Sequence, residues 1–157
     1  MKKRYARLQR EGRVRSHHTN PAEIASLFAV VERDLSDAAI EALSADRRFA
    51  TAYNAALQAA TVMMYAEGYR TSGGGHHWAT FEFLKQVSPV EFGDLADYFD
   101  DCRRKRNRAD YVGVGCVSET EARHLLMEAR RFAEMARTWI RERYPELMPV
   151  RDCKRGE

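Results

Sequence analysis

The sequence predicts an all-α protein, an up-and-down bundle of about five helices. Its apolar residues recur every three or four positions along several segments, which is the spacing of an amphipathic helix. Capping residues stand immediately before four of these segments, and no stretch of alternating polar and apolar residues is long enough to indicate a strand. The connecting loops are short, so neighbouring helices are expected to run antiparallel.

The first two predicted helices follow the cap residues Asn20 and Ser44. Pro21 and Glu23 stand at the first and third helical positions after Asn20, which is a helix-start signal. The inward stripe of this helix is Ile24, Leu27, Phe28, Val31 and Leu35. Residues 36–43 either continue this helix or form a short second one. The helix after Ser44 ends at Gly68, and its stripe is Phe49, Tyr53, Ala56, Ala60, Met63 and Met64.

Three further helices complete the bundle. Residues 76–87 form a short one, after a glycine-rich loop. Ser88, followed by proline and then glutamate, starts the next helix, whose inward residues are Phe92, Leu95, Phe99 and Cys102. Ser118 opens a capping box for the last helix, which ends near Tyr144 and has the inward residues Ala122, Leu125, Ala129, Phe132, Ala136 and Trp139.

Positive charge is concentrated in two places, the N-terminus and residues 103–108. Residues 1–19 hold seven basic residues and a single acidic one, whereas the whole chain has a net charge of only +3. We expect residues 1–19 to be a basic, flexible arm, residues 20–144 to be the helical domain, and residues 145–157 to be a C-terminal tail. Such an arm is either simply solvated or holds RNA, DNA or an acidic partner protein.

The sequence also excludes several classes of protein. No run approaches ~18 consecutive apolar residues, so no helix is expected to span a membrane, and the basic N-terminus lacks the apolar region of a secretory signal. The three cysteines share no metal-binding spacing, and the adjacent histidines His76 and His77 lack the spacing of a zinc pair. We expect a cytoplasmic protein without a metal or another cofactor.

The basic run at 103–108 divides between two faces of its helix. One step of four beyond Cys102 places Arg106 on the core-facing line. Its side of the helix also carries Arg103, Asn107, Asp110 and Tyr111. The residues expected to face solvent are Arg104, Lys105 and Arg108. Because an unpaired charge is costly to bury, the pattern predicts either a specific polar site around Arg106 or a structural ion pair between Arg106 and Asp110.

The string RRKRNRADY at 103–111 resembles the signature region of HEPN domains, which are small helical bundles. Residues 47–70 are similar to the long helix of that family, rich in alanine and aromatic residues. Residues 76–84 and 121–140 fall where the later helices of the family stand, so the resemblance covers residues 20–144. It implies a helical bundle that forms a homodimer.

In catalytic members of the family, an arginine, a polar residue and a histidine make up the signature, and two copies meeting across the dimer cut RNA without a metal. The resemblance maps the arginine to Arg106, the polar residue to Asn107 and the histidine position to Tyr111. Tyr111 is a departure, because a phenol with a pKa near ~10 is a poor general base at neutral pH. The closest branch reads R-N-x-A-D-Y. Its members look like partners of a minimal nucleotidyltransferase, or components of toxin–antitoxin and defence loci.

Three functions remain open from the sequence. In the first, the protein binds RNA, a nucleotide or a cognate partner without cutting it. In the second, it is a ribonuclease in which Arg106 and Asn107 act on the scissile phosphate, while Tyr111 or His77 assists proton transfer. The residues expected to contact phosphate are Arg103, Arg104, Arg108 and His77. In the third, it is an interaction protein in which Arg106 only pairs with Asp110.

Overall fold

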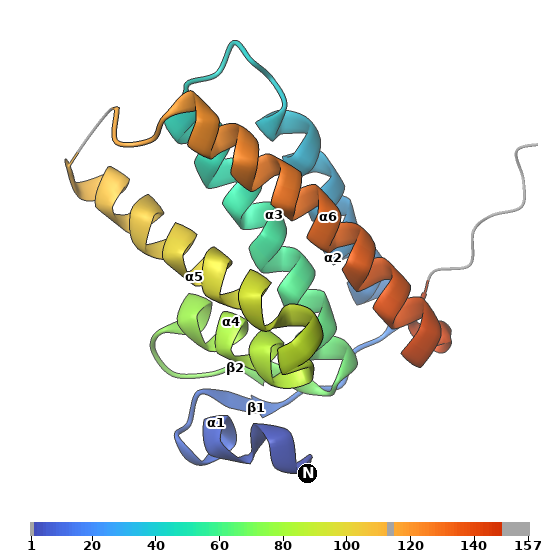
Figure 1. Cartoon of the computed structure of the whole chain (residues 1–157). Coiled ribbons are helices and arrows are strands. Elements are labelled where there is room, and N and C mark those ends of the chain that lie inside the picture. Colours follow the sequence, from blue (N-terminus) through green and yellow to red (C-terminus); the bar gives the residue numbers. More distant parts are fainter. Residues whose placement is uncertain (1, 113–114, 149–157) are drawn as a thin grey trace, which may run out of the picture.

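The computed structural model of the chain describes residues 2–112 and 115–148, the side chains of residues 109–112 excepted. The bundle in this part of the chain consists of five helices of 12 or more residues (Figure 1): α2 Pro21–Ala38, α3 Ala45–Ala66, α4 His76–Val87, α5 Pro89–Val112 and α6 Glu119–Arg143. The predicted all-α bundle is confirmed.

Hydrogen bonds at the helix starts confirm the predicted caps. Asn20 Oδ1 accepts the backbone N–H three residues further on at 2.9 Å, and Ser44 Oγ does the same at 3.2 Å. Ser118 forms a reciprocal capping box at the start of α6. Residues 36–43 do not form a second helix. Helix α2 ends at Ala38, and turns lead from there to α3.

Helix α3 lies at the centre of the bundle, where it packs against α2, α4, α5 and α6 (Figure 1). Its small buried side chains allow close packing of neighbouring helices: Ala52, Ala55, Ala56, Ala59 and Ala60. Between α4, α5 and α6 the core is aromatic instead. Phe99 has its ring centroid 5.8 Å from that of Phe81 and 5.3 Å from that of Phe132. The core therefore combines close helix packing over small side chains of α3 with large aromatic side chains between α4, α5 and α6.

Residues 2–19 lie against the bundle and do not form the flexible arm expected from their charge. They comprise a 3-10 turn (η1, Lys3–Tyr5), the short helix α1 (Ala6–Arg10) and the strand β1 (Val14–Ser16). Tyr5 is fully buried, and its ring stacks on that of Phe83 with the centroids 3.9 Å apart. The charge count missed this packing because exposed basic residues separate the few apolar residues that anchor the segment.

A small antiparallel sheet attaches this segment to the bundle. Strand β1 pairs with β2 (Tyr69–Thr71), and the register places Arg15 opposite Arg70. The sequence shows no alternating pattern at either strand, because strands of three residues are too short to display one. After β2, Gly75 has a φ of +69° and serves as the N-cap of α4, a backbone conformation that favours glycine.

Beyond α6 the chain forms a short 3-10 helix, η2 (Pro145–Leu147), and most of the predicted C-terminal tail lies outside the described residues. The domain boundaries at residues 20 and 144 stay predictions. None of the described helices is long and apolar enough to cross a lipid bilayer.

Candidate functional site

The end of α5 carries the basic run, and Arg106 lies on its core-facing line as the spacing predicts. The side chain is half-buried, and its guanidinium carbon lies 5.4 Å from the centroid of the Tyr53 ring on α3. This is a cation–π contact, in which the electron-rich face of the ring attracts the positive charge. The Nε of Arg106 is shielded from solvent and has no hydrogen-bond partner in the described part of the chain. The guanidinium thus retains a donor that no described residue uses.

Tyr53 also connects Arg106 to His77, in the first turn of α4. The Tyr53 hydroxyl and the Nδ1 of His77 lie 3.0 Å apart, a hydrogen bond between α3 and α4. Burial raises the pKa of Tyr53, so its phenol is protonated at neutral pH. Burial also lowers the pKa of His77, and the positive charges of Arg106 and Arg103 lower it further. His77 is therefore neutral near pH 7.

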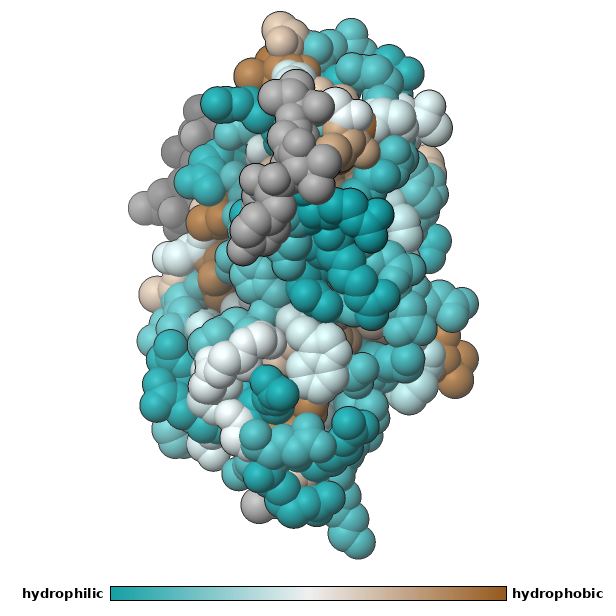
Figure 2. Space-filling model, turned by 90° about the vertical axis from the view of Figure 1, so that its left-hand side faces the viewer, coloured by the Kyte–Doolittle hydropathy of each residue, from teal (hydrophilic) through white to brown (hydrophobic). Residues whose placement is uncertain are grey.

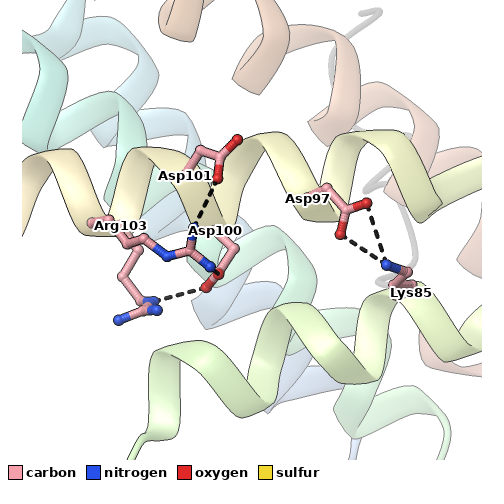
Figure 3. Close-up of polar contacts among 6 residues, drawn as sticks. Lys85, Asp97, Asp100, Asp101 and Arg103 are labelled. Atoms are coloured by element: carbon pink, nitrogen blue, oxygen red, sulfur yellow. Dashed lines mark hydrogen bonds and ion pairs between the residues drawn. The ribbon is translucent and has the colours of Figure 1, made fainter.

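Asp100 holds two arginines of the run on α5 (Figure 3). Arg103 Nε donates to Asp100 Oδ1 at 2.7 Å, and Arg104 Nη2 donates to Asp100 Oδ2 at 3.1 Å. The Arg103 side chain is 22% exposed and that of Arg104 is 63% exposed. Arg103 is therefore the better shielded of the two, and its charge is close enough to affect His77. We call Tyr53, His77, Asp100, Arg103 and Arg106 the arginine cluster.

Several other residues of the predicted site lie outside the arginine cluster. Arg104, Asn107 and Arg108 are exposed on α5. Exposure is the expected outcome for Arg104 and Arg108, whereas Asn107 was expected on the side of the helix that carries Arg106. Lys105 was expected to face solvent, but it is half-buried and forms an ion pair with Glu121 of α6. The cause is that α6 crosses near this part of α5, which the helical spacing of a single helix does not reveal.

Two further residues of the prediction, Asp110 and Tyr111, have side chains outside the described residues. The Arg106–Asp110 pair and the role of Tyr111 stay predictions. Conversely, sequence reasoning missed Tyr53 and Asp100 as members of the site. A signal existed for Asp100, because it precedes Arg103 and Arg104 at ion-pair spacing. None existed for Tyr53, which reads as one more residue of the core stripe.

A cavity of about 410 Å³ lies between α5 and α6, apart from the arginine cluster. Its lining includes Tyr98, Cys102 and His124. The Tyr98 hydroxyl and His124 Nδ1 are hydrogen-bonded at 2.8 Å. Burial raises the pKa of the Cys102 thiol to about 12, so the thiol is protonated and a poor nucleophile at neutral pH. Lys105 in the lining of this cavity is already paired with Glu121, and we place the candidate site at the arginine cluster, where Arg106 has no such partner among the described residues.

The arginine cluster has the chemistry of a phosphate-binding site. A guanidinium group presents planar donors that match the oxygens of a phosphate, and partial burial strengthens the attraction between the charges. The neutral imidazole of His77 can accept a proton or a hydrogen bond. Among the described residues, no group of three or more His, Cys, Asp and Glu side chains is placed to hold a metal ion.

A comparison with known families identifies the family of the chain. A family model described as SAV_6107-like HEPN matches residues 38–137, which is well over half of the chain. The matched span contains every member of the arginine cluster. No curated protein and no solved structure matches the chain significantly. On the strength of the family match and of the helical bundle, the chain belongs to the HEPN family.

Proposed function

We propose that the arginine cluster binds phosphate groups of RNA or of a nucleotide, and that this HEPN protein is a binding module. One observation carries the proposal. The half-buried Arg106 lies over the Tyr53 ring and keeps an Nε donor that no described residue uses. A positive charge in a partly buried place is costly unless an anion compensates it. Asp100 lies with Arg103 and Arg104, and no described carboxylate pairs with Arg106, so a phosphate there would compensate its charge.

The other cations of α5 have supporting roles in this proposal. Arg103 offers a second guanidinium group beside Arg106, oriented by its ion pair with Asp100. Arg104 and Arg108 are exposed, so their charges attract RNA from a distance and are screened by salt. Asn107, also exposed, can donate a hydrogen bond to a phosphate oxygen. Binding without cleavage follows from Tyr111, because a phenol is a poor base in place of the signature histidine.

A metal-independent ribonuclease is the second candidate, and the position of His77 favours it. His77 comes from α4, yet it belongs to the arginine cluster and is neutral at the pH at which a general base is needed. In this alternative His77 accepts the proton of the attacking ribose 2′-hydroxyl, and the bond from phosphorus to the 5′ oxygen breaks as the new bond forms. The leaving oxygen takes a proton from water, while Arg106 stabilises the charge that develops on the phosphate. His77 would then replace the histidine that position 111 lacks.

One experiment separates binding, cleavage and a purely structural role of Arg106. Wild type, Arg106→Gln and the control Arg131→Gln, which removes an exposed arginine of α6, are incubated with labelled RNA in EDTA. Binding is followed by fluorescence anisotropy, cleavage on a gel and folding by thermal melting. We expect wild type and Arg131→Gln to bind RNA without cutting it, and Arg106→Gln to stay folded but bind weakly.

The other outcomes assign the remaining functions. Cleavage by wild type but not by Arg106→Gln would identify the ribonuclease. A lower melting temperature of Arg106→Gln with unchanged RNA binding would identify a structural pair, as in the interaction-protein alternative. Absence of RNA and nucleotide binding by wild type would reject the proposal.

The proposal extends to partners, on the family resemblance. HEPN domains often dimerise, and we propose a homodimer together with a cognate protein of the nucleotidyltransferase type in a toxin–antitoxin or defence system. Light scattering after size exclusion tests the homodimer. Co-purification with a nucleotidyltransferase encoded beside this chain tests the cognate pair, and a monomer that binds no such protein would contradict it.

A further inference from the structure

We infer that the outer face of the β1–β2 sheet extends the arginine cluster into a track for the backbone of single-stranded RNA. The inference rests on the proposed function, because it assigns a second contact surface to the same ligand. The residues that form this track are Arg13, Arg15 and Arg70. None of them lies in the basic run of α5.

Arg15 and Arg70 stand directly opposite each other in the sheet. Directly paired residues of an antiparallel sheet point to the same face, with their Cα atoms roughly 5 Å apart. Like charges in this position destabilise a sheet. Neither arginine forms an ion pair with a described residue, and the Nε of Arg70 is shielded and has no hydrogen-bond partner among them. No ion pair with a described residue therefore offsets the repulsion between these two charges.

Glu23 is the carboxylate that the Arg70 charge affects, and it already has other partners. Its Oε1 accepts hydrogen bonds from Thr19 at 2.7 Å and lies 2.6 Å from His17 Nε2. Although partial burial opposes the shift, these contacts lower the pKa of Glu23, and the Arg70 charge acts in the same direction through space. Glu23 therefore compensates Arg70 only in part, and Arg15 has no ion pair with a described carboxylate.

Contacts of Arg13 and Thr71 place the sheet next to the first turn of α4, which supplies His77 of the arginine cluster. The guanidinium carbon of Arg13 lies 5.2 Å from the centroid of the Trp78 ring on α4, and Arg13 Nη1 donates to the backbone oxygen of Gly74, just before that helix, at 3.0 Å. Thr71 of β2 is hydrogen-bonded to the adjacent His76 at 2.9 Å. The sheet is thus held against the first turn of α4, the same turn that supplies His77.

The figures show where the sheet and the helices lie. In Figure 1, α1 and the β1–β2 sheet lie below α4, on the side opposite the free end of α5. Figure 2 shows the face on which α4 and α5 lie, and hydrophilic side chains cover most of it. Three arginines that form no ion pair with a described residue, on elements that adjoin a phosphate site, fit an extended polyanion with evenly spaced charges. RNA is that ligand, since its phosphates would contact both the sheet and Arg106.

The test uses two charge-matched double variants of the full chain. Arg15→Gln/Arg70→Gln, the track variant, removes the two paired arginines of the track, and Arg130→Gln/Arg131→Gln removes two exposed arginines of α6. Fluorescein-labelled oligouridylates of about 12 and about 3 nucleotides are titrated over a series of salt concentrations. We expect the track variant to bind the longer RNA about tenfold more weakly, with a salt slope reduced by roughly 1.4, or about 0.7 for each phosphate contact. It should bind the shorter RNA like wild type, and its melting temperature should be unchanged or higher.

Three results would overturn the inference. One is unchanged affinity and salt slope of the track variant for the longer RNA while Arg106→Gln still weakens binding, which would leave the proposed function intact. Another is an equal loss in the α6 control variant, or equal competition by poly-glutamate, which would show a non-specific anion surface. Wild type that binds neither RNA would instead reject the proposed function, and the track with it.

Discussion

The Tyr53 hydroxyl lies 3.0 Å from the Nδ1 of His77, and this hydrogen bond ties the middle of α3 to the first turn of α4. The ring of the same tyrosine lies under the guanidinium group of Arg106 from α5. Three helices therefore meet at one side chain. The position of the histidine relative to the arginine depends on this buried tyrosine.

Tyr53→Phe should lower stability while leaving Arg106 in place. The variant loses one partly buried hydrogen bond, which costs about 1 kcal/mol, and a domain of this size should then melt about 2–4 °C lower. The ring remains, so the cation–π contact and RNA binding should be retained. Tyr65→Phe is the control, since the Tyr65 ring packs on His17 and its hydroxyl has no hydrogen-bond partner among the described residues. Equal melting temperatures of the two variants would contradict the role assigned to the Tyr53 hydroxyl.

Arg106→Gln should raise the pKa of His77. Burial is the main cause that lowers this pKa, and the Arg106 charge is the next. Removing the charge takes away a repulsion that disfavours the imidazolium ion, while burial still holds the pKa below its ordinary value of 6.5. An NMR titration of the His77 ring protons measures the shift, with Arg131→Gln as the control. A His77 pKa that is the same in all three proteins would show that Arg106 is not close to His77 in solution.

His77 should also make the protein less stable in mild acid. Its pKa in the folded chain lies below the ordinary value of 6.5, so the unfolded chain binds the proton first as the pH falls. This loss of stability is absent well above pH 6.5, and it grows as the pH decreases toward the pKa of His77 in the folded state. The melting temperature of wild type relative to His77→Gln should therefore fall between about pH 7.5 and about pH 5.5. A constant difference between the two proteins would show that the pKa of His77 is not lowered on folding.

Tyr5→Ala should release the N-terminal segment from the bundle. Tyr5 is fully buried on Phe83, and replacing a buried aromatic side chain by alanine costs roughly 3–5 kcal/mol. Limited trypsin digestion should cut the variant quickly at the arginines of residues 4–15, while wild type is cut slowly there. Lys3→Ala, which changes an exposed residue of the same turn, should behave like wild type. Rapid cleavage of wild type at these sites would mean that the segment is a free arm after all.

The sequence by itself determined the helices and the position of Arg106 on its helix. Both depend on neighbours along the chain. The cap residue Ser118 forms its hydrogen bonds within four residues, and the step from Cys102 to Arg106 is one turn of a regular helix. The family resemblance at residues 103–111 was visible for the same reason, since a short motif needs no knowledge of packing.

Only the tertiary structure decided which side chains share the site. His77 and Arg106 belong to different helices, and they come together because both contact Tyr53 of a third. The same holds for Arg15 and Arg70, which become neighbours through a pairing of two three-residue strands. Contacts of this kind depend on how whole elements pack against one another, and the local spacing of residues carries no information about them.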